Sequence, residues 1–272
     1  AEGDLAAAPA ASVPPGFSLS LFVNGLTLPT DMVFLPNGDL LVAEKGGYGQ
    51  EVGTASVRLI HHGTLRAQPV VTLGVNAEGD SGLLALTIDP DFATNGYFYL
   101  WYATGPSSPG WSGETTDRLA RLTYSPATGT ADLSTHLTLL EGVKWHRWHN
   151  GGGLVFGADK LLYLSTGDAD QTQDARNPQT LNGKVLRIQP TATGYTIPTG
   201  NPYVNMPGAR PEVYAVGLRN PFRALLNPVD QAVERCIPCV DPALQERRPL
   251  VLHLPEPRRD PVIPRQIEVD AF

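Results

Sequence analysis

Charged residues and cysteines are both scarce in this sequence of 272 residues, and each scarcity narrows the class of protein. Only 17% of the residues are charged, and the formal net charge is -7. A nucleic-acid partner is therefore not expected, because a phosphate backbone attracts a basic surface. No run of 18 or more apolar residues occurs, so no membrane span is predicted.

The two cysteines, Cys236 and Cys239, form a single Cys-x-x-Cys pair. They supply at most two zinc ligands, with His253 as a distant candidate for a third. Thioredoxin-like redox chemistry would need a βαβ frame, which the sequence does not show. We therefore expect a local disulfide or two free thiols.

Glycine and proline, by contrast, are abundant, with 28 and 25 residues. They favour tight turns and interrupt helices, and no segment shows a long helical period. Short apolar runs separated by Gly, Pro, Asn or Asp predict an all-β fold. The expected strands are Phe17–Val23, Met32–Leu35, Leu40–Ala43, Val57–His61, Leu83–Ile88, Tyr97–Ala103, Leu119–Tyr124, Leu154–Phe156, Leu161–Ser165, Val185–Ile188 and Val213–Leu218.

A loose internal repeat of the form apolar run, turn, apolar run organises these strands. Its turns lie at Pro36, Pro90, Ala158 and Pro228, which are 54, 68 and 70 residues apart in succession. This spacing accommodates one four-stranded sheet with its loops per repeat, which is typical of a β-propeller. About four such blades are evident.

The composition divides the chain into three parts. Residues 1–14 are expected to be a flexible leader in which no signal peptide is visible, and residues 15–232 an incomplete propeller. Residues 233–272 are rich in Pro and Arg, and no glycine follows Gly217. Because blade hairpins favour glycine, this last part is predicted to be a tail of unknown structure, whose one apolar run, Leu250–Leu254, could add to a sheet edge.

His149 stands directly before Asn150 and a run of three glycines, Gly151–Gly153. Histidine titrates near neutral pH and is a natural general base for a hydroxyl proton. The glycines leave room for a close approach to the backbone. The alternative is a histidine that is simply hydrogen-bonded in a loop.

Nine phrases resemble, in order, the soluble glucose/sorbosone dehydrogenase family, which includes the quinoprotein aldose sugar dehydrogenases. The phrases are Leu28–Met32, Leu35–Val42, Gly82–Leu86, Asp89–Phe92, His149–Gly152, Tyr163–Asp168, Gly183–Ile188, Gly200–Pro202 and Gly217–Pro221. The resemblance implies a six-bladed β-propeller that binds pyrroloquinoline quinone (PQQ) and calcium. It also implies oxidation of the anomeric hydroxyl of an aldose to a lactone, in the periplasm or outside the cell.

The resemblance also implies roles for particular residues. The family's catalytic histidine falls on His149, and its cofactor-contacting Arg-Asn pair falls on Arg219 and Asn220. Asp80 takes the place of a family glutamine near the reacting atoms, and Gln173 that of a glutamine on the substrate side. Trp148 replaces the Asp or Asn that often precedes the histidine and binds sugar.

Some of these features depart from the family pattern. A carboxylate at Asp80 beside an anionic cofactor costs energy unless it is paired or protonated. The calcium-holding turn expected soon after Asn220 has no counterpart in residues 229–245. We therefore expect little or no dehydrogenase activity from this chain alone, and its open sheet edges could pair with a second copy as a homodimer.

Two other functions stay open on sequence grounds. The first is a non-catalytic propeller that binds a carbohydrate or a protein partner. The second is a calcium-dependent lactonase-type propeller, which would need convergent carboxylates that the sequence does not reveal.

Other candidate metal ligands are weaker. His146 and His149 are three residues apart, a spacing that seldom brings two rings together on a loop or strand. Residues 168–174 place oxygen ligands at alternate positions but lack the glycine and glutamate of a calcium loop. His61 and His62 are expected to be solvated or packed at a strand end.

Overall fold

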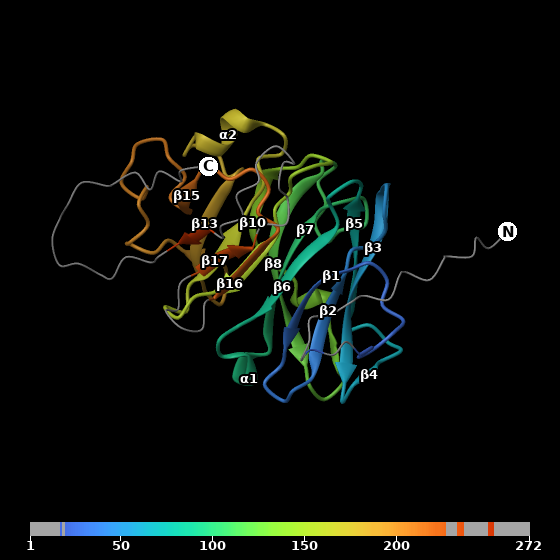
Figure 1. The fold of residues 1–272 in the computed structure, drawn as a ribbon. Coiled ribbons are helices and arrows are strands. Elements are labelled where there is room, and N and C mark those ends of the chain that lie inside the picture. Colours follow the sequence, from blue (N-terminus) through green and yellow to red (C-terminus); the bar gives the residue numbers. More distant parts are fainter. Residues whose placement is uncertain (1–16, 18–19, 227–232, 237–249, 253–272) are drawn as a thin grey trace.

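A computed structural model describes residues 17, 20–226, 233–236 and 250–252 of the chain. The described residues form four antiparallel sheets, which lie next to one another around a shared inner side, and two short helices (Figure 1). This architecture confirms the predicted all-β propeller type with about four blades in this chain. The expected leader, residues 1–14, lies outside the described residues.

Each of the first three sheets has four main strands in chain order and one short added strand. The first comprises β1 (Pro29–Phe34), β2 (Leu40–Glu44), β3 (Gln50–His61) and β5 (Val71–Ala77), with β4 (Thr64–Leu65) added. The second comprises β6 (Leu83–Ile88), β7 (Tyr97–Ala103), β8 (Thr116–Ser125) and β10 (Leu137–Lys144), with β9 (Thr130–Ala131). The third comprises β11 (Gly153–Phe156), β12 (Leu162–Ser165), β13 (Lys184–Pro190) and β15 (Val213–Val216), with β14 (Tyr195–Thr196).

The fourth sheet has three described strands, β16 (Arg223–Leu226), β17 (Val233–Cys236) and β18 (Leu250–Leu252). Two of them lie in the stretch that the sequence predicted to be a tail. Leu250–Leu252 pairs with β17 at the edge of this sheet, as expected for the apolar run there. Cys239 lies outside the described residues, so the expectation for the cysteine pair stays a prediction.

The helices of the described part of the chain are short: α1 (Phe92–Asn95), α2 (Thr172–Arg176) and the 3-10 turn η1 (Leu133–Thr135). None of the described helices has the length and apolar character needed to cross a membrane.

The first strands of successive sheets contact one another, β1 with β6, β6 with β11, and β11 with β16. They therefore form the inner side of the propeller, and the loops that enter them gather at one end. Asp80, His149 and Asn220 all lie in such loops, shortly before β6, β11 and β16 respectively. The order of the strands thus brings together residues up to 140 positions apart in the chain.

The core consists of layers of apolar side chains between neighbouring sheets. The sequence of β7 shows how one strand contributes to two such layers. Successive side chains of a strand point to opposite faces. Phe98, Leu100 and Tyr102 pack against the first sheet, whereas Tyr99 and Trp101 pack toward the third. All five are fully buried. A strand apolar on both faces is what a middle blade requires.

The strand prediction needs correction and completion. Residues 20–23, within the strand expected at Phe17–Val23, are not in a strand. β5 and β10 were not predicted, because glycines and a charge break their apolar pattern. Gly74 is needed in β5 because a Cβ there would lie 2.4 Å from the Ser107 carbonyl carbon.

Asp117, in β8, is fully buried, and neither of its carboxylate oxygens has a hydrogen-bond partner among the described residues. Burial raises the pKa of this carboxyl well above its ordinary value. The native state therefore keeps the proton to higher pH than the unfolded chain, so the free energy of unfolding falls as pH rises from the ordinary pKa to the raised one.

We expect Asp117→Asn to raise the free energy of unfolding by about 1–3 kcal/mol near pH 8, because the amide has no charge to desolvate. The gain should shrink as the pH is lowered toward 4, where the native carboxyl is protonated. Denaturant titrations at several pH values measure both effects. Asp132→Asn, at an exposed turn, is the matched control; equal shifts in the two variants would contradict the prediction.

Candidate active site

His149 lies at the centre of a polar cluster at the end of the propeller where the inner strands begin. Its ring is buried, and its backbone has a φ of 64°, in the left-handed region. Gly151 and Gly152 follow with φ of 74° and 137°. A Cβ on Gly151 would lie 2.5 Å from the Ser165 carbonyl oxygen. The close approach predicted for these glycines is thus made by the backbone of the neighbouring strand.

Asp168 orients the His149 ring. His149 Nδ1 lies 2.7 Å from Asp168 Oδ1, and both side chains are buried. Because an ionised carboxylate only accepts hydrogen bonds, this contact places the proton on Nδ1 and leaves the lone pair of Nε2 available. The pair can therefore act as a general base at Nε2.

The sequence pattern indicated Asp168 only as a candidate calcium ligand and not as the partner of His149. The signal that could have found it is the hairpin of β11 and β12. His149 precedes the first strand and Asp168 follows the second, so antiparallel pairing returns them to the same end.

Asp80 links His149 to Asn220. Its Oδ2 accepts from the His149 backbone N–H at 3.3 Å and from Asn220 Nδ2 at 3.2 Å. Asn220 Oδ1 in turn accepts from the Gly151 N–H at 3.1 Å. Asp80 thus accepts hydrogen bonds from both His149 and Asn220.

Lys45 lies close enough to interact electrostatically with Asp80. Its Nζ donates to the carbonyls of Gly47, Ala77 and Gly79. Burial lowers the pKa of Lys45, and the Asp80 charge opposes that shift. The amine therefore helps to balance the negative charge at this end of the molecule.

Arg219 lies at the same end as His149, because its carbonyl accepts from the Asp168 N–H at 2.8 Å. Its side chain is exposed. Trp148 is also exposed, with the Arg147 guanidinium 5.0 Å from its ring centre. Gln173, in α2, is exposed and donates to Gln171.

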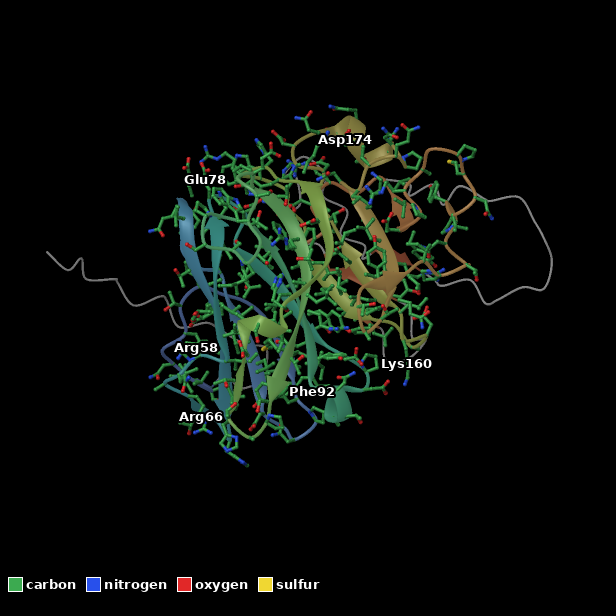
Figure 2. The ribbon with its side chains drawn as sticks, turned by 180° about the vertical axis from the view of Figure 1, so that it is seen from behind. Arg58, Arg66, Glu78, Phe92, Lys160 and Asp174 are labelled. Carbon is green, nitrogen blue, oxygen red and sulfur yellow. The ribbon has the colours of Figure 1, made fainter. Side chains whose placement is uncertain are left out.

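Figure 2 shows Glu78, near Asp80, and Asp174, in α2, at one end of the molecule, and Arg66 and Lys160 at the other. Asp80, His149, Asp168 and Asn220 are joined by direct hydrogen bonds, whereas Trp148, Arg219 and Gln173 have no such bond between their side chains and that group among the described residues. The predicted roles of all these residues remain predictions.

A cavity of about 340 Å³ adjoins the cluster. Its lining includes Asp80 and Gly151 from the site and Lys45, which directly follows β2, together with Thr30 of β1, Leu84 of β6 and Arg223 of β16. The cavity therefore opens beside the hydrogen-bonded group and at the inner strands of three sheets.

The calcium loop considered for residues 168–174 does not converge. Asp168 binds His149, whereas Asp174 pairs with Lys144 Nζ at 2.7 Å. In the described part of the chain, no group of three His, Cys, Asp or Glu ligands includes a residue of this site. The described residues therefore do not fit a calcium ion held by acidic side chains here. His146 and His149 are likewise held by different partners, Trp148 and Asp168.

A planar anionic quinone such as PQQ fits the donors better. Arg219 offers a permanently charged fork, and the Asn220 amide has a second N–H beyond the one given to Asp80. His149 Nε2 lies at the same end. The hydrogen-bond donors of Arg219 and Asn220 thus suit one side of such a cofactor.

The fold and the site define a β-propeller with a histidine–aspartate pair at the end where its inner strands begin. The chain belongs to the glucose/sorbosone dehydrogenase family, whose sequence model matches residues 26–234. The predicted family is confirmed.

Curated relatives include the human hedgehog-interacting protein, 30% identical over 83% of this chain and 34% of that protein. Aldose sugar dehydrogenase YliI of Escherichia coli is 27% identical over 82% of this chain and 56% of that protein. This chain therefore spans between a third and little more than half of the length of these relatives.

Solved structures of similar proteins superpose on this chain. A protein of Thermus thermophilus described as an oxidoreductase (glucose dehydrogenase) superposes with a TM-score of 0.66 at 31% identity, covering 79% of this chain and 59% of that one. The PQQ-bound aldose sugar dehydrogenase of Streptomyces coelicolor superposes with a TM-score of 0.61 at 27% identity, covering 80% and 58%.

Proposed function

We propose that this chain forms the base-bearing part of a PQQ-dependent sugar dehydrogenase that oxidises the anomeric hydroxyl of an aldose to a lactone. The observation that carries the proposal is the buried 2.7 Å contact between His149 Nδ1 and Asp168, at the same end as Arg219 and Asn220. The solved structures of a glucose dehydrogenase and a PQQ-bound aldose sugar dehydrogenase support the choice of reaction.

His149 accepts the proton of the anomeric hydroxyl at Nε2. Asp168 stabilises the imidazolium that forms and keeps the ring in the tautomer that can accept. The hydrogen bond from the His149 backbone to Asp80 fixes the loop that carries the ring. Exclusion of water from the buried ring strengthens both interactions.

Arg219 and Asn220 would hold the cofactor, Arg219 through a charge-assisted contact with a carboxylate and Asn220 through its amide N–H. When bound, PQQ supplies the acceptor for the hydride that leaves the anomeric carbon. Asp80 positions Asn220 and His149 relative to each other through its bonds to both.

A calorimetric titration with PQQ in the presence of calcium tests the proposal. We expect saturable binding to the chain that weakens about tenfold or more in Arg219→Ala, because a charge-assisted contact is worth about 1.5–3 kcal/mol. The matched control is Arg66→Ala, an exposed arginine at the opposite end (Figure 2). Absence of heat with the parent chain, or an equal loss in both variants, would refute PQQ binding by this site.

A second candidate is a non-catalytic propeller that binds a carbohydrate or protein partner. The similarity to the hedgehog-interacting protein favours it, as does a carboxylate at position 80 next to the proposed site of an anionic cofactor. Under this reading, PQQ gives no heat, and His149 and Asp168 only stabilise the loop before β11.

A further inference from the structure

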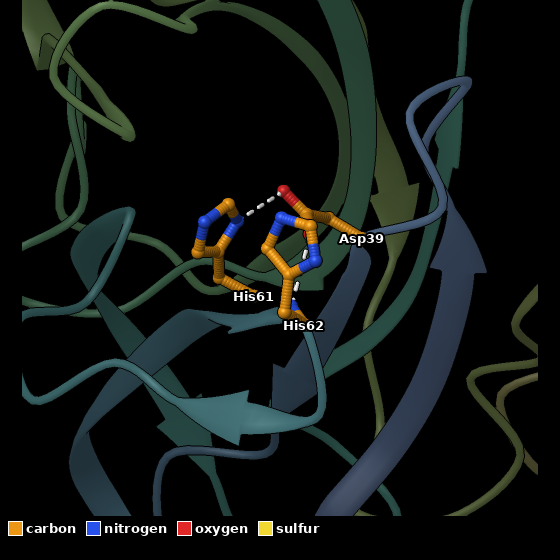
Figure 3. A group of neighbouring side chains, drawn as sticks. All are labelled: Asp39, His61 and His62. Carbon is orange, nitrogen blue, oxygen red and sulfur yellow. Dashed lines mark hydrogen bonds and ion pairs between the residues drawn. The ribbon is translucent and has the colours of Figure 1, made fainter.

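A second cluster of polar side chains lies at the end of the first sheet opposite the His149 site. Asp39, in the turn between β1 and β2, and His61 and His62, at the end of β3, offer ligand atoms that all lie within 4.8 Å of one another (Figure 3). His61 Nδ1 is 2.8 Å from Asp39 Oδ2, and the His62 N–H donates to Asp39 Oδ1 at 3.3 Å. The expectation of two merely solvated or packed histidines is thus incomplete.

The turn that carries His62 is one in which histidine is an unusual choice. His61 pairs with Thr64, so the loop consists of His62 and Gly63, with φ of 48° and 76°. Two left-handed residues in a two-residue hairpin define a type I′ turn, which favours Asn-Gly or Asp-Gly. The turn geometry therefore does not explain the imidazole at position 62.

Asp39 is oriented toward the two histidines before any ligand binds. Asn37 Nδ2 donates to Asp39 Oδ2 at 2.9 Å, and the Asp39 N–H donates to Asn37 Oδ1 at 3.1 Å. Burial opposes ionisation of Asp39, but hydrogen bonds from His61, Asn37 and the His62 N–H outweigh it, so the pKa lies below its ordinary value. The carboxylate is therefore charged at neutral pH.

We propose that Asp39, His61 and His62 bind a divalent transition-metal ion of the zinc type. Two imidazole nitrogens and one carboxylate oxygen are the ligands that Zn²⁺ and Co²⁺ accept, whereas Ca²⁺ and Mg²⁺ prefer an all-oxygen shell. Asp39 is buried, but His61 is partly exposed and His62 is exposed, which leaves the remaining coordination positions to water.

Binding adds a further link between the turn that carries Asp39 and the turn that carries His62, beside the hydrogen bonds already present. Because a metal ion binds the unprotonated form of imidazole, affinity is expected to rise with pH. The site is remote from His149, so it neither requires nor supports the proposed dehydrogenase activity.

Titration of the full chain with CoCl₂ at pH 8, followed by the visible absorption of Co²⁺ and repeated with ZnCl₂ by calorimetry, tests the site. The protein should carry no histidine tag and should have Cys236→Ser and Cys239→Ser, so that thiolates contribute no ligand. One ion per chain is expected to bind, and Zn²⁺ should displace Co²⁺.

His62→Asn removes the imidazole and keeps a residue that the type I′ turn favours, so the variant should fold. We expect it to weaken binding about tenfold or more, as His61→Asn should. His146→Asn, at the other end of the molecule, is the matched control and should bind as the parent does. Unchanged affinity in His62→Asn, or loss of binding in His146→Asn, would overturn the proposal.

Discussion

His149→Ala is expected to lower aldose-dependent dye reduction by the protein loaded with PQQ and calcium by about 10²- to 10⁴-fold, the usual contribution of a positioned general base. The expected reason is loss of the buried imidazole that faces Asp168 through Nδ1 and offers the Nε2 lone pair to the substrate proton. Turnover of the parent chain should itself be low, so the reduction of bound PQQ in a single turnover is the more sensitive measurement.

His62→Asn, at the opposite end, serves as the control and should leave the rate within about twofold of the parent. Asp168→Asn distinguishes loss of the general base from loss of folding. The asparagine amide can still hydrogen-bond to the His149 ring, but it holds the ring in the tautomer that cannot accept the proton at Nε2. This variant should lower the rate and change the pH profile while PQQ binding persists. A His149→Ala variant that reduces PQQ at the parent rate would exclude His149 as the base.

The sequence predicted the repeated unit well because each blade depends on local signals. Apolar runs separated by turn residues specify strands and hairpins, and β6 and β7 match the expected bounds. β5 escaped prediction because the close approach of Ser107 requires Gly74, which breaks the apolar run. Tertiary packing, not local propensity, decides such strands.

The site was predictable only in part for the same reason. His149 and Asn220 could be named from the resemblance, but their connection through Asp80 depends on loops that are 69 and 140 residues apart in sequence. No local pattern encodes such a contact. The pairing of Asp39 with His61 and His62 depends in the same way on the register of β2 and β3, which places Leu40 opposite Ile60.

Gly167 provides a structural test of how tightly the His149 loop is held. A Cβ at this position would lie 1.8 Å from the His149 carbonyl oxygen and 2.9 Å from the Asn150 nitrogen. Both atoms belong to the backbone, so neither can move aside as a side chain would. The same carbonyl accepts from the Ala169 N–H, and the Gly167 carbonyl accepts from the Gly183 N–H at 2.7 Å.

We therefore expect Gly167→Ala to lower the free energy of unfolding by about 3–5 kcal/mol, since overpacking against fixed backbone is among the larger effects of single substitutions. Denaturant unfolding followed by circular dichroism measures this. Gly194→Ala is the matched control, because no atom lies within 4 Å of its Cβ position, and it should change stability by about 0.5 kcal/mol or less. Equal unfolding midpoints for the two variants would mean that the loop relaxes freely, and that the contact between His149 and Asp168 does not depend on this close backbone packing.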